Sequence, residues 1–102
     1  MKVSKLPIYL NFDKIVDFCQ HYHIQKLALF GSVLREDFTN QSDVDVLVEF
    51  EQGKTPGLAI ITIEDELSQI INWQTDLRTP NDLSRYFREE VMKEALVIYE
   101  QN

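Results

Sequence analysis

The stretch of sequence that decides the fold is FGSVLREDFTNQSDVDVLVEF, residues 30–50. The apolar run over residues 26–30 is too short for an independent helix and stops at Gly31, which predicts a buried strand that enters a tight turn. A short helix around residues 33–36 is expected after the turn. Residues 43–50 alternate apolar and acidic side chains, and this period predicts a second strand. Two strands joined through a glycine turn therefore form the centre of the predicted fold.

Gly31 and Ser32 form a candidate phosphate-binding turn. A glycine lets the backbone approach a ligand closely, and a serine hydroxyl and the amides of the next turn can donate hydrogen bonds to phosphate oxygens. Arg35, one turn later, is a candidate contact for the same phosphates. Two alternatives stay open. Gly31 and Ser32 can be an ordinary turn and helix cap, and Arg35 can pair with the neighbouring acidic residues at 36 and 37.

Three aspartates form a candidate metal site. Asp43 and Asp45 are two positions apart in a predicted strand, so both carboxylates project from one face, about 6–7 Å apart at Cα. Together they can bind one or two hard cations such as Mg²⁺. Asp76 is the candidate third ligand, because it lies in an extended segment, residues 73–80, that can pair with the carboxylate strand. The alternative interpretation is a half-exposed edge strand with solvated aspartates.

The spacing of these residues resembles a known family. A Gly-Ser pair at 31–32, ten further residues and an Asp-x-Asp at 43–45 match the motif of the minimal nucleotidyltransferases of the DNA polymerase beta superfamily. In particular, the chain resembles the antitoxin half of HEPN–MNT toxin–antitoxin modules, from about residue 27 to residue 99. Two positions depart from the family pattern: Glu36 stands where a glycine is common, and Arg78 stands where an apolar residue is common.

The resemblance implies an activity and a site. It implies a protein adenylyltransferase, the antitoxin of a type VII-like system, that transfers AMP from ATP to a tyrosine of a cognate HEPN ribonuclease toxin and so silences it. Two Mg²⁺ ions are implied as cofactors. The implied catalytic and metal-binding residues are Asp43, Asp45 and Asp76, and the implied nucleotide contacts are Gly31, Ser32 and Arg35. Two alternatives are an antitoxin that acts by binding alone and an enzyme that adenylylates an antibiotic, although this chain has no room for a separate domain for such a substrate.

Composition limits the partners and the compartment. A length of 102 residues, 44% of them hydrophobic and 26% charged, is typical of one globular domain over residues 1–102. The formal net charge of −7 argues against direct binding to nucleic acid and suits a basic protein partner. No apolar run is long enough for a membrane span or a signal peptide, so we expect no membrane partner and a cytoplasmic protein. The single cysteine, Cys19, is expected in the core of a helix.

The remaining periodicities complete a prediction of class α/β (α+β), with a small mixed sheet flanked by helices. Helices are expected over residues 11–22, 58–71 and 85–95, and a final strand over residues 96–99. The β-branched run at 60–63 also permits a strand there. Trp73 is interpreted as a core residue, with adenine stacking as the alternative, and the histidines at 21 and 23 as helix-end residues.

Overall fold

A four-stranded mixed sheet forms the centre of the protein in the computed structural model, which describes residues 6–101. In the sheet the strands are ordered β3-β2-β1-β4. β1 is antiparallel to both β2 and β4, and β2 is parallel to β3. The sheet confirms the predicted mixed architecture. The strands are β1 (Ile24–Phe30), β2 (Val44–Phe50), β3 (Thr75–Arg78) and β4 (Leu96–Glu100).

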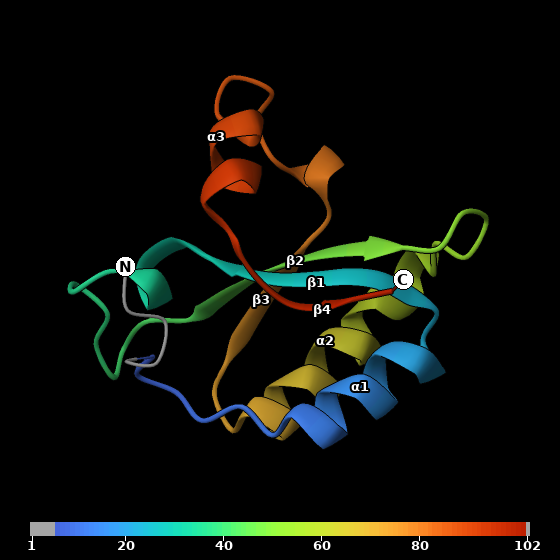
Figure 1. The fold of residues 1–102 in the computed structure, drawn as a ribbon, viewed down its shortest axis with the longest axis horizontal. Helices are drawn as coiled ribbons and strands as arrows, with labels where there is room; N and C mark the ends of the chain where they lie inside the picture. The colour runs from blue at the N-terminus through green and yellow to red at the C-terminus, as the bar shows by residue number, and fades with distance from the viewer. Residues whose placement is uncertain (1–5, 102) are drawn as a thin grey trace.

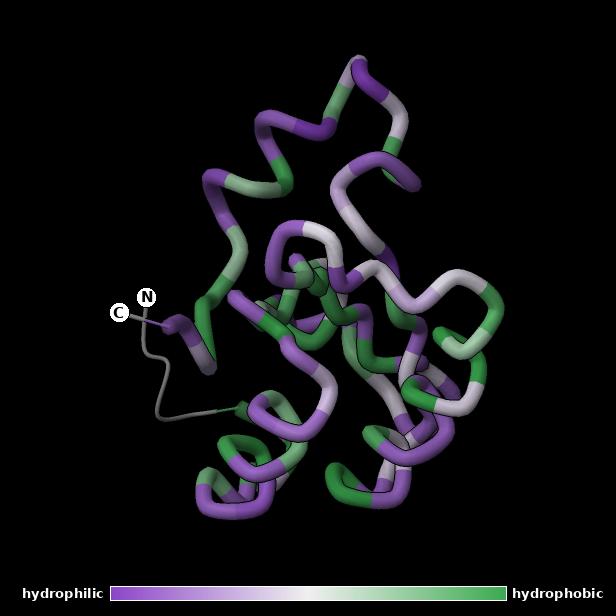
Figure 2. The backbone as a smooth tube through the Cα atoms, turned by 90° about the vertical axis from the view of Figure 1, so that its right-hand side faces the viewer, coloured by the Kyte–Doolittle hydropathy of each residue, from purple (hydrophilic) through white to green (hydrophobic). Residues whose placement is uncertain are grey.

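The two faces of the sheet are covered differently. The helices α1 (Phe12–His21) and α2 (Ile60–Ile71) pack together against one face, and α3 (Arg88–Glu94) projects from the other side (Figure 1). Successive strand side chains point to opposite faces, so Val46 of β2 enters the main core with α1 and α2, and Leu47 joins a smaller cluster with Val91 of α3. Hydrophobic segments gather where the strands meet α1 and α2, which lie below the sheet (Figure 2).

The predicted first two long helices are confirmed. Asn11 caps α1, because its Oδ1 accepts a hydrogen bond from the Lys14 amide at 3.2 Å. α2 begins after a 3-10 turn at Gly57–Ala59, and its buried residues Ile63, Leu67 and Ile71 recur every four positions. That spacing excludes the strand alternative for residues 60–63.

The short helix expected at residues 33–36 is wrong in extent. A 3-10 helix spans Gly31–Leu34 instead, and Arg35 after it is extended, with φ −121° and ψ 170°. The Arg35 amide closes this turn by donating to the carbonyl of Ser32 at 2.9 Å. Ser32 therefore lies inside the turn and does not cap it; Phe30 holds the cap position, with no side-chain hydrogen bond.

The helix expected over residues 85–95 is also shorter than predicted. The amides of Phe87 and Arg88 both bond to the carbonyl of Ser84, at 3.1 and 2.9 Å, which makes a turn of the residues before α3. The sequence predicted a helix that included this turn, because side chains in a turn have a spacing similar to that at the end of a helix.

Single residues behave largely as the sequence indicated. Cys19 is fully buried in α1, and burial raises its pKa to about 12. Trp73 packs against the main core with its ring centroid 5.2 Å from that of Phe38, which confirms its interpretation as a core residue. Within residues 6–101 no helix has the length and apolar character to span a membrane.

Candidate active site

Three neighbouring strands bring the candidate site residues into one row. Phe30, the last residue of β1, lies opposite Asp45 on β2, and Asp45 lies opposite Asp76 on β3. Adjacent strands are about 4.8 Å apart, and residues opposite one another share a face. That face is the one turned away from α1 and α2, because Val44 and Val46 beside Asp45 are both in the main core. The two aspartates therefore lie side by side on the open face.

Gly31 lies against this row and is required by its geometry. Its φ of +77° is in the left-handed region that favours glycine, and a Cβ built on it would overlap Oδ2 of Asp45. The carboxylate of Asp45 thus sits directly on the turn at Gly31, so phosphates bound at this turn would lie beside the carboxylate.

The ionised form of Asp45 is disfavoured by its surroundings. Its pKa is raised, first by burial and then by the negative charges of Asp76 and Asp43, and the nearby Arg78 and Arg35 oppose the rise. A carboxylate whose ionisation is disfavoured by its neighbours gains when a cation binds between them. Asp43 and Asp76 are thus both close enough to act on Asp45.

Asp76 is held by an ion pair with Arg78 on its own strand. Nε of Arg78 donates to Oδ1 and Nη2 donates to Oδ2, both at 3.1 Å, so the guanidinium occupies both carboxylate oxygens. The pair is partly solvated, with 47% of the Arg78 side chain and 36% of the Asp76 side chain exposed. The hydrogen bond to Asp76 also raises the pKa of Arg78.

A buried polar network fixes the strand that carries Asp76. Thr75 is almost fully buried, its amide donates to Oγ of Ser68 at 3.1 Å, and the two hydroxyls are 2.7 Å apart. Next to it, the Leu77 amide donates to Oε2 of Glu64 at 2.7 Å. Sequence reasoning missed this network; polar residues at 64 and 68, four apart on the inner side of α2, were the available signal.

Asp43 lies one residue before β2 and not within it, contrary to the expected strand over residues 43–50. Its side chain is exposed. The backbone on both sides of it is fixed: the indole Nε1 of Trp73 donates to the Ser42 carbonyl at 2.7 Å, and the Val44 amide donates to the Gln74 carbonyl at 2.9 Å. Trp73 therefore supports the segment that carries Asp43.

The three carboxylates do not form a closed metal cage. Among residues 6–101, no group of three or more histidine, cysteine, aspartate or glutamate side chains is placed to hold a metal ion. Asp45 and Asp76 are neighbours on adjacent strands, but the oxygens of Asp76 are turned to Arg78. The same residues could hold a hard cation if Asp76 released the guanidinium, since carboxylate oxygens are the preferred ligands of Mg²⁺.

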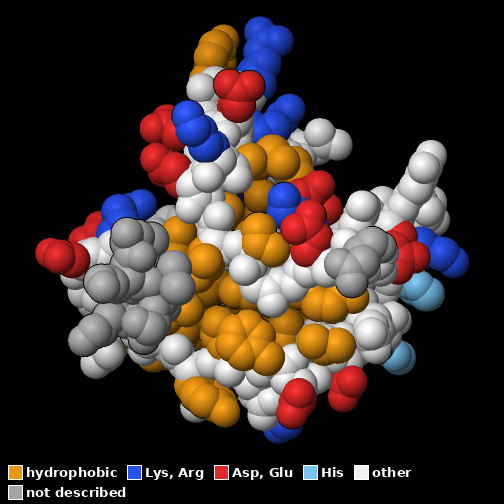
Figure 3. All heavy atoms as spheres, in the orientation of Figure 1, with side chains coloured by type: hydrophobic (Ala, Val, Ile, Leu, Met, Phe, Trp, Pro, Cys, Tyr) orange, Lys and Arg blue, Asp and Glu red, His pale blue; other side chains and the backbone are white. Residues whose placement is uncertain are grey.

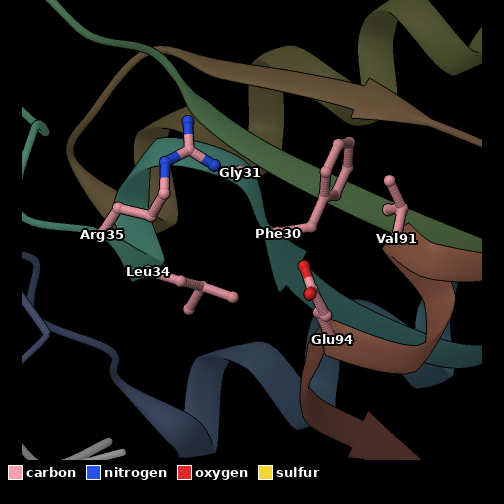
Figure 4. Close-up of a pocket in the computed structure, with 6 residues that line it drawn as sticks. All are labelled: Phe30, Gly31, Leu34, Arg35, Val91 and Glu94. Carbon is pink, nitrogen blue, oxygen red and sulfur yellow. The ribbon is translucent and has the colours of Figure 1, made fainter. Parts of the chain in front are cut away.

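A cavity of about 390 Å³ opens beside the turn at Gly31. The turn contributes Arg35 and Leu34, and α3 contributes Val91 and Glu94 from the facing side (Figure 4). Its size is within the range of small-molecule sites. The contribution of α3 to its wall was missed, because no local pattern indicates which face of the sheet a distant helix covers.

Arg35 has an acidic neighbour in the structure. Its Nε lies 3.3 Å from Oδ1 of Asp37, and both side chains are mostly exposed. An exposed pair of this kind contributes little to stability. Arg35 therefore remains available to contact a ligand in the cavity that it lines.

Comparison with known proteins decides the family. The model of the family described as polymerase beta, nucleotidyltransferase, matches residues 13–102. The chain belongs to this nucleotidyltransferase family. A relative from Methanocaldococcus jannaschii, provisionally assigned as a protein adenylyltransferase, is 28% identical over 83 residues, which cover 81% of this nucleotidyltransferase and 88% of the relative. Protein adenylyltransferase MntA of Thermococcus cleftensis is 28% identical over 79 residues, with 78% and 79% covered.

A solved structure shares the fold of this nucleotidyltransferase. It contains the tri-AMPylated HEPN toxin of Shewanella oneidensis in complex with an MNT antitoxin, and the similarity has a TM-score of 0.62. The two chains are 19% identical, with 89% of this nucleotidyltransferase and 71% of the other chain covered. The fold expected from the sequence is therefore confirmed.

Proposed function

We propose that this nucleotidyltransferase is the antitoxin of a toxin–antitoxin pair and acts as a protein adenylyltransferase. It transfers AMP from ATP to a tyrosine of a cognate HEPN ribonuclease toxin, which is thereby silenced. The observation that carries the proposal is the row formed by Asp45 and Asp76 on adjacent strands beside the turn at Gly31. The names of its relatives and the AMPylated toxin in the complex of similar fold support the acceptor class.

The donor set fits Mg²⁺. Asp43, Asp45 and Asp76 supply only oxygen ligands. The pKa of Asp45 is raised first by burial and then by the charges of Asp76 and Asp43, and a bound cation would offset both effects. We assign these three residues as the metal ligands and, through the metal, as the catalytic carboxylates. When bound, Mg²⁺ would neutralise phosphate charge and favour ionisation of the attacking hydroxyl, and two ions are the expected number.

The other residues position the nucleotide. We assign the Gly31 turn and the Ser32 hydroxyl as donors to phosphate oxygens, and Arg35 as a further contact from the rim of the cavity. The apolar wall formed by Phe30 and Val91 suits the adenine ring. In the reaction, the tyrosine oxygen attacks the α-phosphorus, the bond from that phosphorus to the β-phosphate oxygen breaks, and pyrophosphate leaves.

The protein acceptor agrees with the charge of the chain. The net charge of −7 disfavours a nucleic-acid acceptor and favours a basic protein, and a ribonuclease is expected to carry a basic surface for its own substrate. Charged side chains cover the projecting α3 region, and apolar side chains gather below it in the same view (Figure 3). A partner subunit that packs against the open face of the sheet would complete the walls of the site. We place the complex in the cytoplasm.

The test is the intact mass of a cognate HEPN toxin after co-expression with wild type and variants. The variant Asp43→Asn/Asp45→Asn removes two of the three proposed ligands. Asp65→Asn is the matched control, since Asp65 is exposed on α2, which covers the other face of the sheet. Toxin that gains one or more AMP masses with wild type and Asp65→Asn, but not with the double variant, would support the proposal.

The same experiment separates the alternatives. Toxin that stays unmodified but is silenced in a stable complex by all three forms would point to an antitoxin that acts by binding alone. Modification that persists at the wild-type level in the double variant would refute the assignment of the carboxylates.

A further inference from the structure

Arg78 has a geometry that is specific to its acidic partner. Residues 76 and 78 are two apart on one strand, so both side chains lie on the open face of the sheet. The planar guanidinium fork matches both carboxylate oxygens of Asp76 at 3.1 Å. The positively charged guanidinium of Arg78 is therefore already bound to Asp76, one of the proposed metal ligands.

We propose that Arg78 is a positioning residue that closes Asp76 to divalent cations and must turn away before a metal ion can use this carboxylate. The inference rests on the proposed function, because it concerns the same carboxylates. Its consequence is that the free protein binds divalent cations more weakly than its three aspartates would allow without Arg78.

Competition between the two cations is the physical reason. A metal ion that binds either oxygen of Asp76 must break at least one of the two hydrogen bonds to Arg78, and it meets a positive charge a few ångströms away.

The test measures metal binding directly, by titrating Mn²⁺ into the full chain without nucleotide and recording the free Mn²⁺ signal by electron paramagnetic resonance. Arg78→Gln removes the charge and the fork, and Arg78→Lys keeps the charge but cannot bind both oxygens in the same way. Arg85→Gln is the matched control, because it removes the same charge from an exposed residue whose guanidinium lies 5.6 Å from the ring centroid of Tyr86. Circular dichroism verifies that each variant is folded.

We expect Arg78→Gln to bind Mn²⁺ about fivefold more tightly than wild type, from the energies typical of partly exposed ion pairs. Arg78→Lys should lie between the two, and Arg85→Gln should match wild type. In an Asp76→Asn background the effect of Arg78→Gln should disappear, since the closed carboxylate is then absent.

Two results would overturn the inference alone. One is an unchanged Mn²⁺ affinity in Arg78→Gln; the other is a gain of the same size in the Asp76→Asn background, which would reveal a general charge effect. Arg78→Gln that binds Mn²⁺ no better than the triple variant Arg78→Gln/Asp43→Asn/Asp45→Asn would remove the metal site itself, and both the inference and the proposed function would then fail. Binding by wild type with no effect of Arg78 leaves the proposed function intact, so the two failures are distinguishable.

Discussion

Replacing Gly31 with alanine tests the close packing of the turn against Asp45. Gly31 and Gly53 have nearly the same backbone angle, with φ of +77° and +79°, but their surroundings differ. A Cβ at Gly31 would overlap Oδ2 of Asp45, whereas a Cβ at Gly53 would meet no atom within 4 Å. Gly53→Ala is therefore a matched control that carries the backbone strain without the clash.

The expected magnitudes separate the two effects. An alanine in the left-handed region costs about 1–2 kcal/mol, so we expect this loss in the free energy of unfolding for Gly53→Ala. Gly31→Ala should lose a further 1–3 kcal/mol, roughly, because Asp45 must move out of its place. For a chain of this size each kcal/mol lowers Tm by about 4–8 °C, which thermal unfolding followed by circular dichroism resolves.

Activity and a double variant complete the test. A displaced Asp45 should reduce AMP transfer roughly 100-fold in Gly31→Ala, and Gly53→Ala should retain wild-type transfer. In an Asp45→Ala background, Gly31→Ala should cost no more stability than Gly53→Ala, because the clashing carboxylate is gone. Equal losses of stability in Gly31→Ala and Gly53→Ala, with transfer preserved in both, would refute the argument.

Three further predictions concern stability and reactivity. Without metal, Asp45→Asn should be more stable than wild type at pH 7. The pKa of Asp45 is raised on folding, so the contribution of Asp45 to the free energy of unfolding is present below the ordinary pKa of 3.8 and is lost as the pH rises through the pKa of the folded state. Thermal unfolding in chelator at pH 4 and 7 should show the difference growing with pH, and a constant difference would contradict it. Because burial raises the pKa of Cys19 to about 12, a maleimide should label its thiol only at the rate of unfolding, and rapid labelling of the native protein would disprove this. Ser68→Ala should lower stability by about 1–3 kcal/mol through the lost partners of buried Thr75, whereas Thr62→Ala, at an exposed position of the same helix, should not lower the unfolding midpoint.

Arg78 departs from the family pattern, and its role can be understood only from the structure. In the sequence, Arg78 was only an unexpected residue near a candidate ligand. In the structure Arg78 pairs with Asp76, so it competes with the proposed metal ion for this carboxylate. The short distance along one strand made this pair foreseeable, because residues two apart share a face.

The errors in the sequence prediction fall at element ends. The turn at Gly31 became a 3-10 helix over Gly31–Leu34, β2 began at Val44, and α3 began at Arg88. Local periodicity identifies the type of an element better than its ends, because the ends depend on hydrogen bonds to neighbouring segments. The amide of Val44, for example, bonds to the distant carbonyl of Gln74.

The sequence by itself determined the types of the main elements and the spacing of the motif, because side-chain periodicity and the glycine turn are local properties of the chain. It named Asp43, Asp45 and Asp76 as candidates but not their arrangement. Only the tertiary structure decided that Asp45 lies opposite Asp76, that Gly31 leaves room for this carboxylate, and that α3 forms a wall of the cavity. Strand register and the face that a helix covers depend on contacts between segments far apart in the chain, which local patterns do not encode.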